Sequence, residues 1–286
     1  MRVLIFYQRA NKRSQSVTNC LQEGIAKCHA GESVLMLDEA EYRAPLPADV
    51  VCFYGLSGNF MKLFQDYRKV GTETVFIDLA YWGRKGDAQP DFHRIAVNGY
   101  QPTSYFKFDA TPERFSVFNK TIQPWRTTGE EILVAGMSER AARVWNLGGA
   151  TEHAAAMIAE IRKHTDRPIA YRPKPSWVDA QPIPGTRYAN GLLQDELRRA
   201  WMVVTYRSNV AVDALIEGVP ILVLGDHPAS LMSHNDLSRI EDPWRPEDPM
   251  RLNFCSSLAW HQFSLREMRS GWMWKTIRKH GYLKSI

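Results

Sequence analysis

The sequence predicts an α/β protein of two Rossmann-like domains that face each other across a cleft, with C-terminal helices packing back across both. Short runs of β-branched and aromatic residues alternate with helical segments, which is typical of βαβ units around a parallel sheet. A second series of this kind follows a polar segment containing Pro and Gly at residues 119–131. The 286 residues are 44% hydrophobic, which is enough apolar content for two cores.

The first domain is expected to span residues 1–122. Its predicted strands begin with "RVLIFY" and lie at 2–7, 33–37, 49–55 and 74–79, with predicted helices at 14–28 and 58–69. The loop 83–112 is rich in Gly, Pro and Asn and contains one further predicted strand at 93–99.

The second domain is expected to span residues 130–260. Its predicted strands lie at 131–137, 168–173, 202–206 and 220–225, and its predicted helices at 151–163, 192–200 and 208–217. The residues from 234 onward are helical and aromatic in character. Within them, residues 261–286 are expected to form a basic helical tail that crosses back to the first domain.

Composition excludes several protein classes. No apolar run approaches the ~18 residues that span a bilayer, and "MRVLIFYQR" is too short for a signal peptide. The four cysteines form no CxxC pair, so the sequence supports neither a zinc site nor a disulfide framework. We therefore expect a soluble cytoplasmic protein, in the host cytoplasm if the gene is phage-encoded, for which a monomer is compatible with the sequence.

Positive charge is concentrated at the two chain ends. Residues 264–286 carry net +5 and residues 1–13 carry net +4, of a total of +5, so the middle of the chain is net negative. This distribution favours an anionic partner, either nucleic acid or a phosphorylated substrate. The alternative is a basic helix that is simply solvated.

Small and cationic residues follow three predicted strands of the second domain. Because ligands bind at the carboxyl ends of parallel strands, these residues predict a diphosphate site. A helix N-terminus and charge-assisted contacts from cations both favour a phosphate there. The residues are Gly136, Ser138, Arg140, Arg172, Lys174, Ser208 and Asn209.

Asp213 and Glu217 are spaced i, i+4 on the helix that begins near Ser208, so they share one face. A carboxylate on this face is suited to accept hydrogen bonds from ribose hydroxyls. The alternative for this region is that Ser208 only caps the helix and both acids are solvated.

The segment "RSNVAVDALIEGVPILVLG" resembles the donor-binding segment of GT-B glycosyltransferases, and "YRPKP" resembles the matching strand end in capsule-polysaccharide and lipopolysaccharide-core transferases. The resemblance implies a nucleotide-diphosphate sugar as donor, most simply a UDP-sugar. Two features depart from it. The chain is short for the group, and the spaced pair of glutamates of many retaining members is absent.

The order "ADVVCFYG", helix, "TETVFIDLAYWGR" resembles the first domain of phage DNA β-glucosyltransferases. This resemblance implies that Asp78, at the end of a strand, is the general base for an acceptor hydroxyl. Alternatively, Asp78 caps the following loop or pairs with Arg84. His93 and Asp87 are the other candidate bases.

The loop after Asp78 combines aromatic and cationic residues, namely Tyr81, Trp82, Arg84 and Lys85. Aromatic faces beside cations are suited to a stacked, phosphate-bearing acceptor such as a flipped nucleotide, and they also pack on sugar rings. Trp82 is equally compatible with a place in the core. Arg9, Lys12 and Arg13 add acceptor-binding candidates near the N-terminus.

Metal signals are weak. The sequence has no Asp-x-Asp, and no motif requires a divalent ion, although one remains compatible with the fold. Asp226, His227, His234 and Asp236 lie close in sequence, but their spacing is that of a loop with satisfied histidines. If this loop has a function, His227 is placed to contact the donor.

We therefore expect a hexosyltransferase of GT-B type that acts by single-displacement inversion. The acceptor first expected is the hydroxymethyl group of a modified pyrimidine, 5-hydroxymethylcytosine or 5-hydroxymethyluracil, in phage DNA. The alternative enzyme is a transferase for bacterial capsule or lipopolysaccharide. A further alternative is a non-catalytic nucleotide- or nucleic-acid-binding module.

Overall fold

The computed structural model describes residues 1–28, 31, 33–84, 91–106 and 110–284. The chain forms two compact units. Unit 1 comprises Met1–Lys107 and Leu258–Ile286, and unit 2 comprises Phe108–Ser257. Each unit contains its own mainly parallel sheet, which confirms the predicted fold class of two Rossmann-like α/β domains.

The sheet of unit 1 has the strand order β11-β5-β4-β3-β1-β2. The first four strands along the chain are parallel, whereas β5 pairs antiparallel with β4, and β11 pairs antiparallel with β5. The bounds are β1 Arg2–Tyr7, β2 Ser33–Asp38, β3 Val50–Tyr54, β4 Glu73–Leu79, β5 Phe92–Val97 and β11 Gln262–Ser264.

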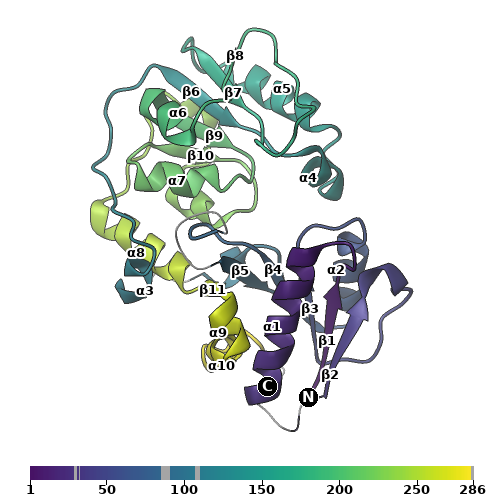
Figure 1. Ribbon diagram of the computed structural model, residues 1–286. Helices are drawn as coiled ribbons and strands as arrows, with labels where there is room; N and C mark the ends of the chain where they lie inside the picture. Colours follow the sequence, from purple (N-terminus) through teal and green to yellow (C-terminus); the bar gives the residue numbers. More distant parts are fainter. Residues whose placement is uncertain (29–30, 32, 85–90, 107–109, 285–286) are drawn as a thin grey trace. The chain divides into compact units, whose positions relative to one another are not determined.

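Two helices cover opposite faces of this sheet (Figure 1). On one face α1 (Lys12–Cys28) packs on aliphatic residues of the strands, with Val17, Leu21 and Ile25 fully or almost fully buried. On the other face α2 (Phe60–Lys69) packs through aromatic rings, among them Phe60 against Phe76 at 4.9 Å between ring centroids. Because successive side chains of a strand point to opposite faces of the sheet, the position of a residue along its strand decides whether it packs against α1 or against α2.

The C-terminal helices α9 (Leu265–Arg269) and α10 (Trp272–Lys279) belong to unit 1 and pack on α1. Ser264 and Glu267 form a reciprocal capping box that begins α9. Lys27 Nζ of α1 donates a hydrogen bond to the carbonyl of Arg269 at 3.0 Å. The buried side chains of α10 include Met273, Trp274 and Ile277, so most of its apolar surface is used in the core.

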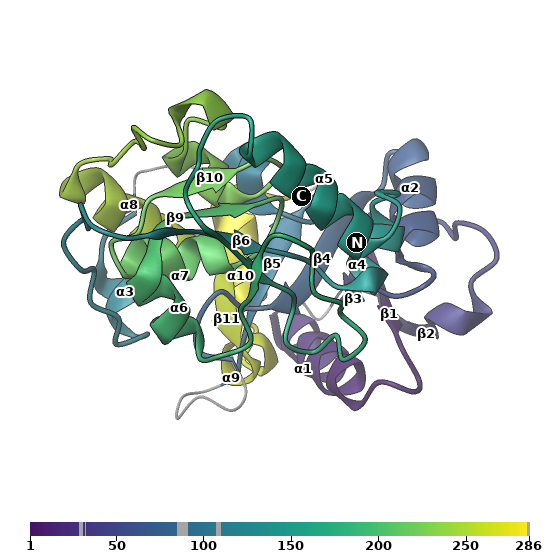
Figure 2. The same ribbon diagram turned by 90° about the horizontal axis from the view of Figure 1, so that it is seen from above.

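The sheet of unit 2 is entirely parallel, with the strand order β10-β9-β6-β7-β8. Helix α5 lies on one face, and α6 and α7 lie on the other (Figure 2). The strands are β6 Glu131–Ala135, β7 Ile169–Arg172, β8 Arg187–Tyr188, β9 Ala200–Thr205 and β10 Ile221–Val223. The helices are α3 Glu113–Ser116, α4 Glu139–Val144, α5 Ala150–Ile161, α6 Leu193–Arg199, α7 Val210–Ile216 and α8 Asp248–Ala259.

The division between the units differs from the boundaries expected at 122–130 and at 260. Residues within the expected linker hydrogen-bond inside unit 2. Gln123 N–H donates to the carbonyl of Ile216 at 2.7 Å, and Arg126 N–H donates to that of Gly218 at 2.8 Å. Trp125 also lies under the Arg251 guanidinium, 4.1 Å from ring centroid to Cζ. Backbone pairing therefore fixes this segment against α7 and its C-terminal turn.

Several short elements were not predicted. Helix α4 and strands β8 and β11 are too short to show a periodic pattern in sequence. The predicted strand at 93–99 is present as β5, but it runs antiparallel to β4. Among the helices that the structure describes, none combines the length and apolar character needed to cross a membrane. Short 3-10 turns complete the chain at Glu39–Glu41, Pro102–Tyr105, Pro228–Met232 and Leu237–Arg239.

Candidate functional site

The strand order of unit 2 reverses at β6. From β6 the chain continues to β7 on one side and later returns to β9 on the other side. In open α/β sheets, ligands bind at the carboxyl ends of the strands beside such a switch point. The segment 136–138 after β6 and the segment 206–209 after β9 are therefore the parts of unit 2 to inspect.

The backbone after β6 is closely packed at Gly136. Its N–H donates to the carbonyl of Arg172 at 2.9 Å, and a Cβ at this position would lie 2.9 Å from the ring of Tyr171. Ser138 then caps α4, since its Oγ accepts a hydrogen bond from Ala141 N–H at 3.4 Å. A residue with a side chain at 136 would displace either the tyrosine or the strand end.

Thr205 connects the ends of β6 and β9. Its buried Oγ1 donates to the carbonyl of Ala135 at 2.8 Å and accepts from the N–H of Ser208 at 3.1 Å. Ser208 Oγ in turn accepts from Val210 N–H at 3.3 Å. One hydroxyl thus holds the turn before α7 against the neighbouring strand, which positions the backbone of this turn before any ligand binds.

His227 is fully buried behind this turn. Its Nδ1 accepts a hydrogen bond from Ala229 N–H at 3.1 Å, and its Nε2 lies 3.2 Å from Asn209 Oδ1. Because Nδ1 accepts, the proton resides on Nε2 and is donated to Asn209. The structure therefore brings together Asn209 and His227, which follow the neighbouring strands β9 and β10.

Helix α7 is short, with Ser208 and Asn209 before it and Glu217 as its C-cap. Asp213 lies in the first turn, and its carbonyl accepts the Glu217 N–H at 3.0 Å. A helix of seven residues has a smaller dipole than a long helix. A phosphate at this site would therefore depend mainly on backbone N–H groups and side chains of the two strand ends.

The predicted cations around this sheet differ in their surroundings. Arg172 is only 9% exposed, and its Nη1 donates to the carbonyls of Gly191 at 2.8 Å and Ala189 at 3.3 Å. These hydrogen bonds fix the segment after β8, and the guanidinium also places a positive charge at the edge of the sheet. Lys174 and Arg140 are exposed.

An aromatic and cationic cluster near the β9 end was not predicted. The Arg207 guanidinium lies over Trp145 and Tyr206, at 4.6 Å and 5.2 Å from the ring centroids. The Tyr206 ring meets His153 of α5 edge-on at 4.9 Å, and burial lowers the pKa of His153. The sequence feature that could have indicated this cluster is the position of Arg207, between the end of a predicted strand and Ser208.

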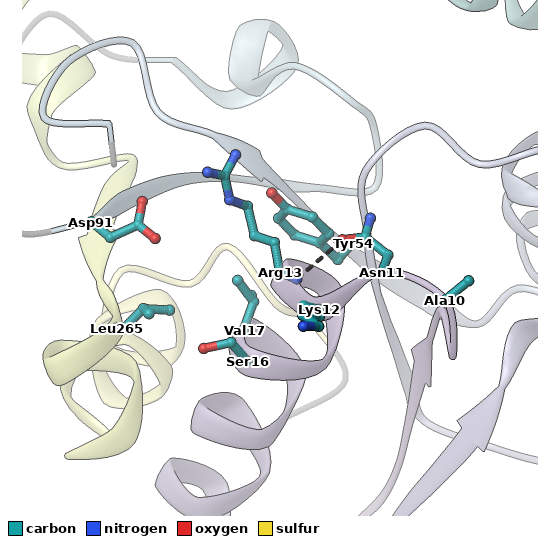
Figure 3. A pocket seen from close by; sticks show the side chains of 9 residues that line it. All are labelled: Ala10, Asn11, Lys12, Arg13, Ser16, Val17, Tyr54, Asp91 and Leu265. Carbon is teal, nitrogen blue, oxygen red and sulfur yellow. Dashed lines mark hydrogen bonds between the residues drawn. The ribbon is translucent and has the colours of Figure 1, made fainter. Parts of the chain in front are cut away.

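Unit 1 also has a switch point, at β1, and a cavity of about 550 Å³ lies beside it. Figure 3 shows its lining: side chains of α1 and the turn before it, Tyr54 at the end of β3, and Asp91 and Leu265. This volume falls within the roughly 300–1,000 Å³ of small-molecule sites. Lys12 and Arg13, both predicted to bind the acceptor, line it. Arg9 instead pairs with Asp38 at 2.8 Å and with Glu41 at 3.0 Å.

Asp78 forms an ion pair with Arg94, with 2.9 Å between Oδ2 and Nη2, while its Oδ1 accepts the N–H of Leu79 at 2.8 Å. The antiparallel register pairs Asp78 with Arg94 and Leu79 with His93. Paired residues share a face, so Asp78 lies on the α2 face together with Arg94 and Phe76. The pairing with Arg84 considered from sequence is replaced by pairing with Arg94.

His93 lies on the α1 face of the same sheet and is fully buried. Its ring meets Tyr54 edge-on at 5.6 Å. Burial lowers the pKa of His93, which the nearby Asp91 carboxylate opposes.

The aromatic residues after Asp78 lie in the core, since Tyr81 is 1% and Trp82 is 2% exposed. The side chain of Gln262 accepts the N–H groups of both residues, at 2.7 and 3.1 Å. Arg84 donates to the carbonyls of Ala80 and Tyr81. These contacts favour the core alternative for Trp82 over an exposed stacking surface. Lys85 and Asp87 lie outside the described residues.

The loop considered for metal binding has separate partners for its histidines. His227 is held by Asn209, whereas the ring of the exposed His234 lies tilted against Trp244, with 5.1 Å between ring centroids. Across the described residues, no group of three or more His, Cys, Asp or Glu is arranged to hold a metal ion.

No protein-family model matches the sequence, and no curated protein matches it. Solved structures do match. The beta Kdo 2,4 transferase of Thermosulfurimonas dismutans KpsC is similar with a TM-score of 0.53 at 13% identity, over 90% of each chain. The beta Kdo 2,7 transferase of the same KpsC has a TM-score of 0.52 at 13% identity, over 96% of this chain and 99% of that chain. The chain has the fold of these two transferases.

At 13% identity, this structural similarity establishes the fold, and the reaction has to be inferred from the residues of the site. The predicted architecture of two Rossmann-like α/β domains agrees with this fold. The resemblance to phage DNA glucosyltransferases has no support in these matches.

Proposed function

We propose that the protein is a glycosyltransferase that uses a nucleotide-activated sugar and acts on a bacterial surface polysaccharide. The observation that carries this proposal is the switch point of unit 2. There, Gly136 and Ser138 after β6 lie beside the turn of Ser208 and Asn209 after β9, which Thr205 and His227 hold. Hydroxyls and an amide at the carboxyl ends of parallel strands suit a nucleotide phosphate.

The chemistry proposed for unit 2 is stabilisation of the leaving nucleotide. As the bond between the anomeric carbon and the phosphate oxygen breaks, negative charge grows on that oxygen. Preorganised donors lower the barrier because they need no reorganisation at that moment. A UDP-sugar is the first donor to test, and a divalent ion is compatible with this chemistry.

Two observations bear on the reaction and on its acceptor. Both structural neighbours described above are named as Kdo transferases, which supports transfer of a sugar. Tyr81 and Trp82, which were expected to stack on a flipped base, are buried in the core of unit 1, which disfavours a DNA acceptor. If the protein instead acts on DNA, it should bind duplex DNA at ~50 mM salt, and its affinity should fall as the salt concentration rises.

The first test is binding and transfer with a panel of UDP-, CMP-, GDP- and dTDP-linked sugars. We expect one nucleotide class to raise the melting temperature of the protein and to donate its sugar to a glycan, read by mass spectrometry. Thr205→Val removes the hydroxyl that links the two strand ends and should weaken nucleotide binding about tenfold or more, because the turn before α7 must then be ordered when the nucleotide binds.

Thr205→Ser is the matched control, because it keeps the hydroxyl and should bind nucleotide within about threefold of the wild type. If no nucleotide sugar binds the wild-type protein, the proposed function is wrong. Transfer to hydroxymethylated DNA in preference to glycans would restore the DNA acceptor.

A further inference from the structure

Exposed cations surround the junction of α1 with the C-terminal helices α9 and α10 of unit 1 (Figure 1). Of these cations, Arg269 alone pairs with an acid among the described residues, namely Glu23 at 3.1 Å. Helix α10 contains no acidic residue. Together with two half-buried tryptophans, the cations form what we call the basic-aromatic surface, which consists of Lys27, Arg269, Lys275, Lys279, Trp260 and Trp272.

This surface lies toward the amino ends of the parallel strands. Helix α1 follows β1 and leads to β2, so its last turn is beside the amino end of β2. At this turn, Cys28 Sγ donates to the carbonyl of Gly271, directly before α10, at 3.2 Å. After α10, the backbone N–H of Lys284 donates to the carboxylate of Glu73, the first residue of β4, at 2.8 Å. The basic-aromatic surface is therefore separate from the carboxyl ends of the strands, where small ligands of α/β sheets bind.

The core of unit 1 holds α10 in one orientation. Trp272, Lys275 and Lys279 are spaced i, i+3 and i+7, so they share the outer face of the helix. The opposite face is buried and comprises Met273, Trp274, Thr276 and Ile277. The outer face thus presents an aromatic residue and two cations on a fixed backbone, which reduces the entropy that docking must overcome.

The aromatic rings of this surface are tilted against one another. The Trp260 ring lies 5.9 Å from that of Trp272 at 42°, and 6.1 Å from that of His280 at 51°. Stacking of a nucleic-acid base or a sugar ring needs a flat, exposed ring face. The headgroup region of a lipid bilayer instead accommodates tryptophan side chains at its boundary with the acyl chains. The aromatic geometry therefore favours a lipid surface over a nucleic acid.

We propose that the basic-aromatic surface docks the protein on a membrane that contains anionic phospholipids. The lysine stems lie along the headgroup region while their ammonium groups contact lipid phosphates. Trp260 and Trp272 enter the same region from the side of the protein. This inference goes beyond the proposed function and does not depend on it, because lipid binding requires no sugar donor.

The test is cosedimentation of the full-length protein with vesicles of phosphatidylcholine alone, or of phosphatidylcholine with ~30% phosphatidylglycerol, at ~50 mM salt. We expect binding to the anionic vesicles to be about tenfold stronger or more than to the neutral ones. Most of this binding should be lost at ~500 mM salt, because salt screens the attraction between exposed charges.

Lys275→Gln/Lys279→Gln should lower the partition coefficient on anionic vesicles about tenfold or more, because each cation near the membrane contributes about fivefold. Lys275→Arg/Lys279→Arg keeps both charges and should bind within about threefold of the wild type. Lys62→Gln/Lys69→Gln is the matched control, since it makes the same change in net charge at exposed positions of α2, on the opposite face of the sheet. It should also bind within about threefold, and melting curves confirm that each variant is folded.

Vesicles with lipids brominated near the headgroup test the role of the tryptophans. Bromine quenches tryptophan fluorescence at short range, so the bound wild type should be quenched and Trp272→Phe should show a smaller quenched fraction. If the bound wild type is not quenched, the tryptophans stay outside the bilayer and their part of the proposal is overturned.

Three results would overturn the membrane proposal itself. The first is no binding to anionic vesicles at ~50 mM salt. The second is an equal loss of binding in the α2 control, which would place the contact elsewhere. The third is binding to duplex DNA, lost in Lys275→Gln/Lys279→Gln, without binding to vesicles, which would assign the surface to nucleic acid.

Discussion

Single polar side chains connect neighbouring strand ends in both units. In unit 2 the Thr205 hydroxyl joins the end of β6 to the turn before α7. In unit 1 the Gln8 amide joins the end of β3 to the start of α1 through Asn11. Both contacts order backbone at a switch point before a ligand arrives, which reduces the entropy that binding must overcome.

His261 predicts a pH dependence of stability. It lies between the rings of Phe106 and Tyr282, and burial lowers its pKa to about 3, helped by the charge of His280. In the unfolded chain the pKa is roughly 6.5. Between these values the unfolded state binds more protons than the native state. Stability is therefore complete above about pH 6.5 and decreases below it, by up to about 1.4 kcal/mol per pH unit.

Denaturant unfolding between pH 7 and pH 4 measures this effect. His261→Gln should be less stable at neutral pH, because it loses ring packing, but its stability should depend less steeply on pH. The exposed His164 serves as the matched control, since His164→Gln should keep the wild-type slope. Identical slopes for both variants would contradict the role of His261.

At the scale of elements, α1 and α9 approach too closely for a side chain at Gly24. A Cβ at this position would overlap the carbonyl oxygen of Met268, and one at Gly271 would lie 2.7 Å from the carbonyl oxygen of Gly24. Gly271 also has φ +83°, which disfavours any other residue. The seam between α1 and the C-terminal helices therefore depends on these two glycines.

Gly24→Ala should destabilise unit 1 by about 1–3 kcal/mol, because the helices must move apart. An ordinary Gly to Ala change inside a helix has the opposite sign and stabilises by about 1 kcal/mol. Asn19→Ala, at an exposed position of α1, is the control and should be neutral or slightly stabilising. Thermal unfolding shows whether Gly24→Ala lowers the melting temperature, as expected here, or raises it.

At the scale of the molecule, each unit has its own sheet, core and switch point. A nucleotide sugar should therefore slow hydrogen exchange at residues 131–140 and 205–212 of unit 2. Protection of unit 1 by a nucleotide sugar, with none in unit 2, would contradict the proposed nucleotide site.

Much of the fold could be predicted from local patterns. Alternating strands and helices, with Gly136 directly after one strand and Ser208 in the turn after another, are enough to predict two mainly parallel sheets and a ligand site at the carboxyl ends of the strands. The short elements β8, β11 and α4 could not be predicted, because two to six residues do not establish a period. The antiparallel direction of β5 depends on its partner β4, which local sequence does not specify.

By itself, then, the sequence determined the fold class and the residues that follow the strands of unit 2, because both depend on hydrophobic patterns and turn residues that are close together in the chain. Only the tertiary structure decided on which side of the sheet each acid lies. One step of register separates Asp78, paired with Arg94, from His93, which packs behind the cavity. Only the tertiary structure likewise shows the cavity that Arg13, Tyr54 and Asp91 line. Strand order brings these residues together, and strand order is set by long-range pairing that no local pattern contains.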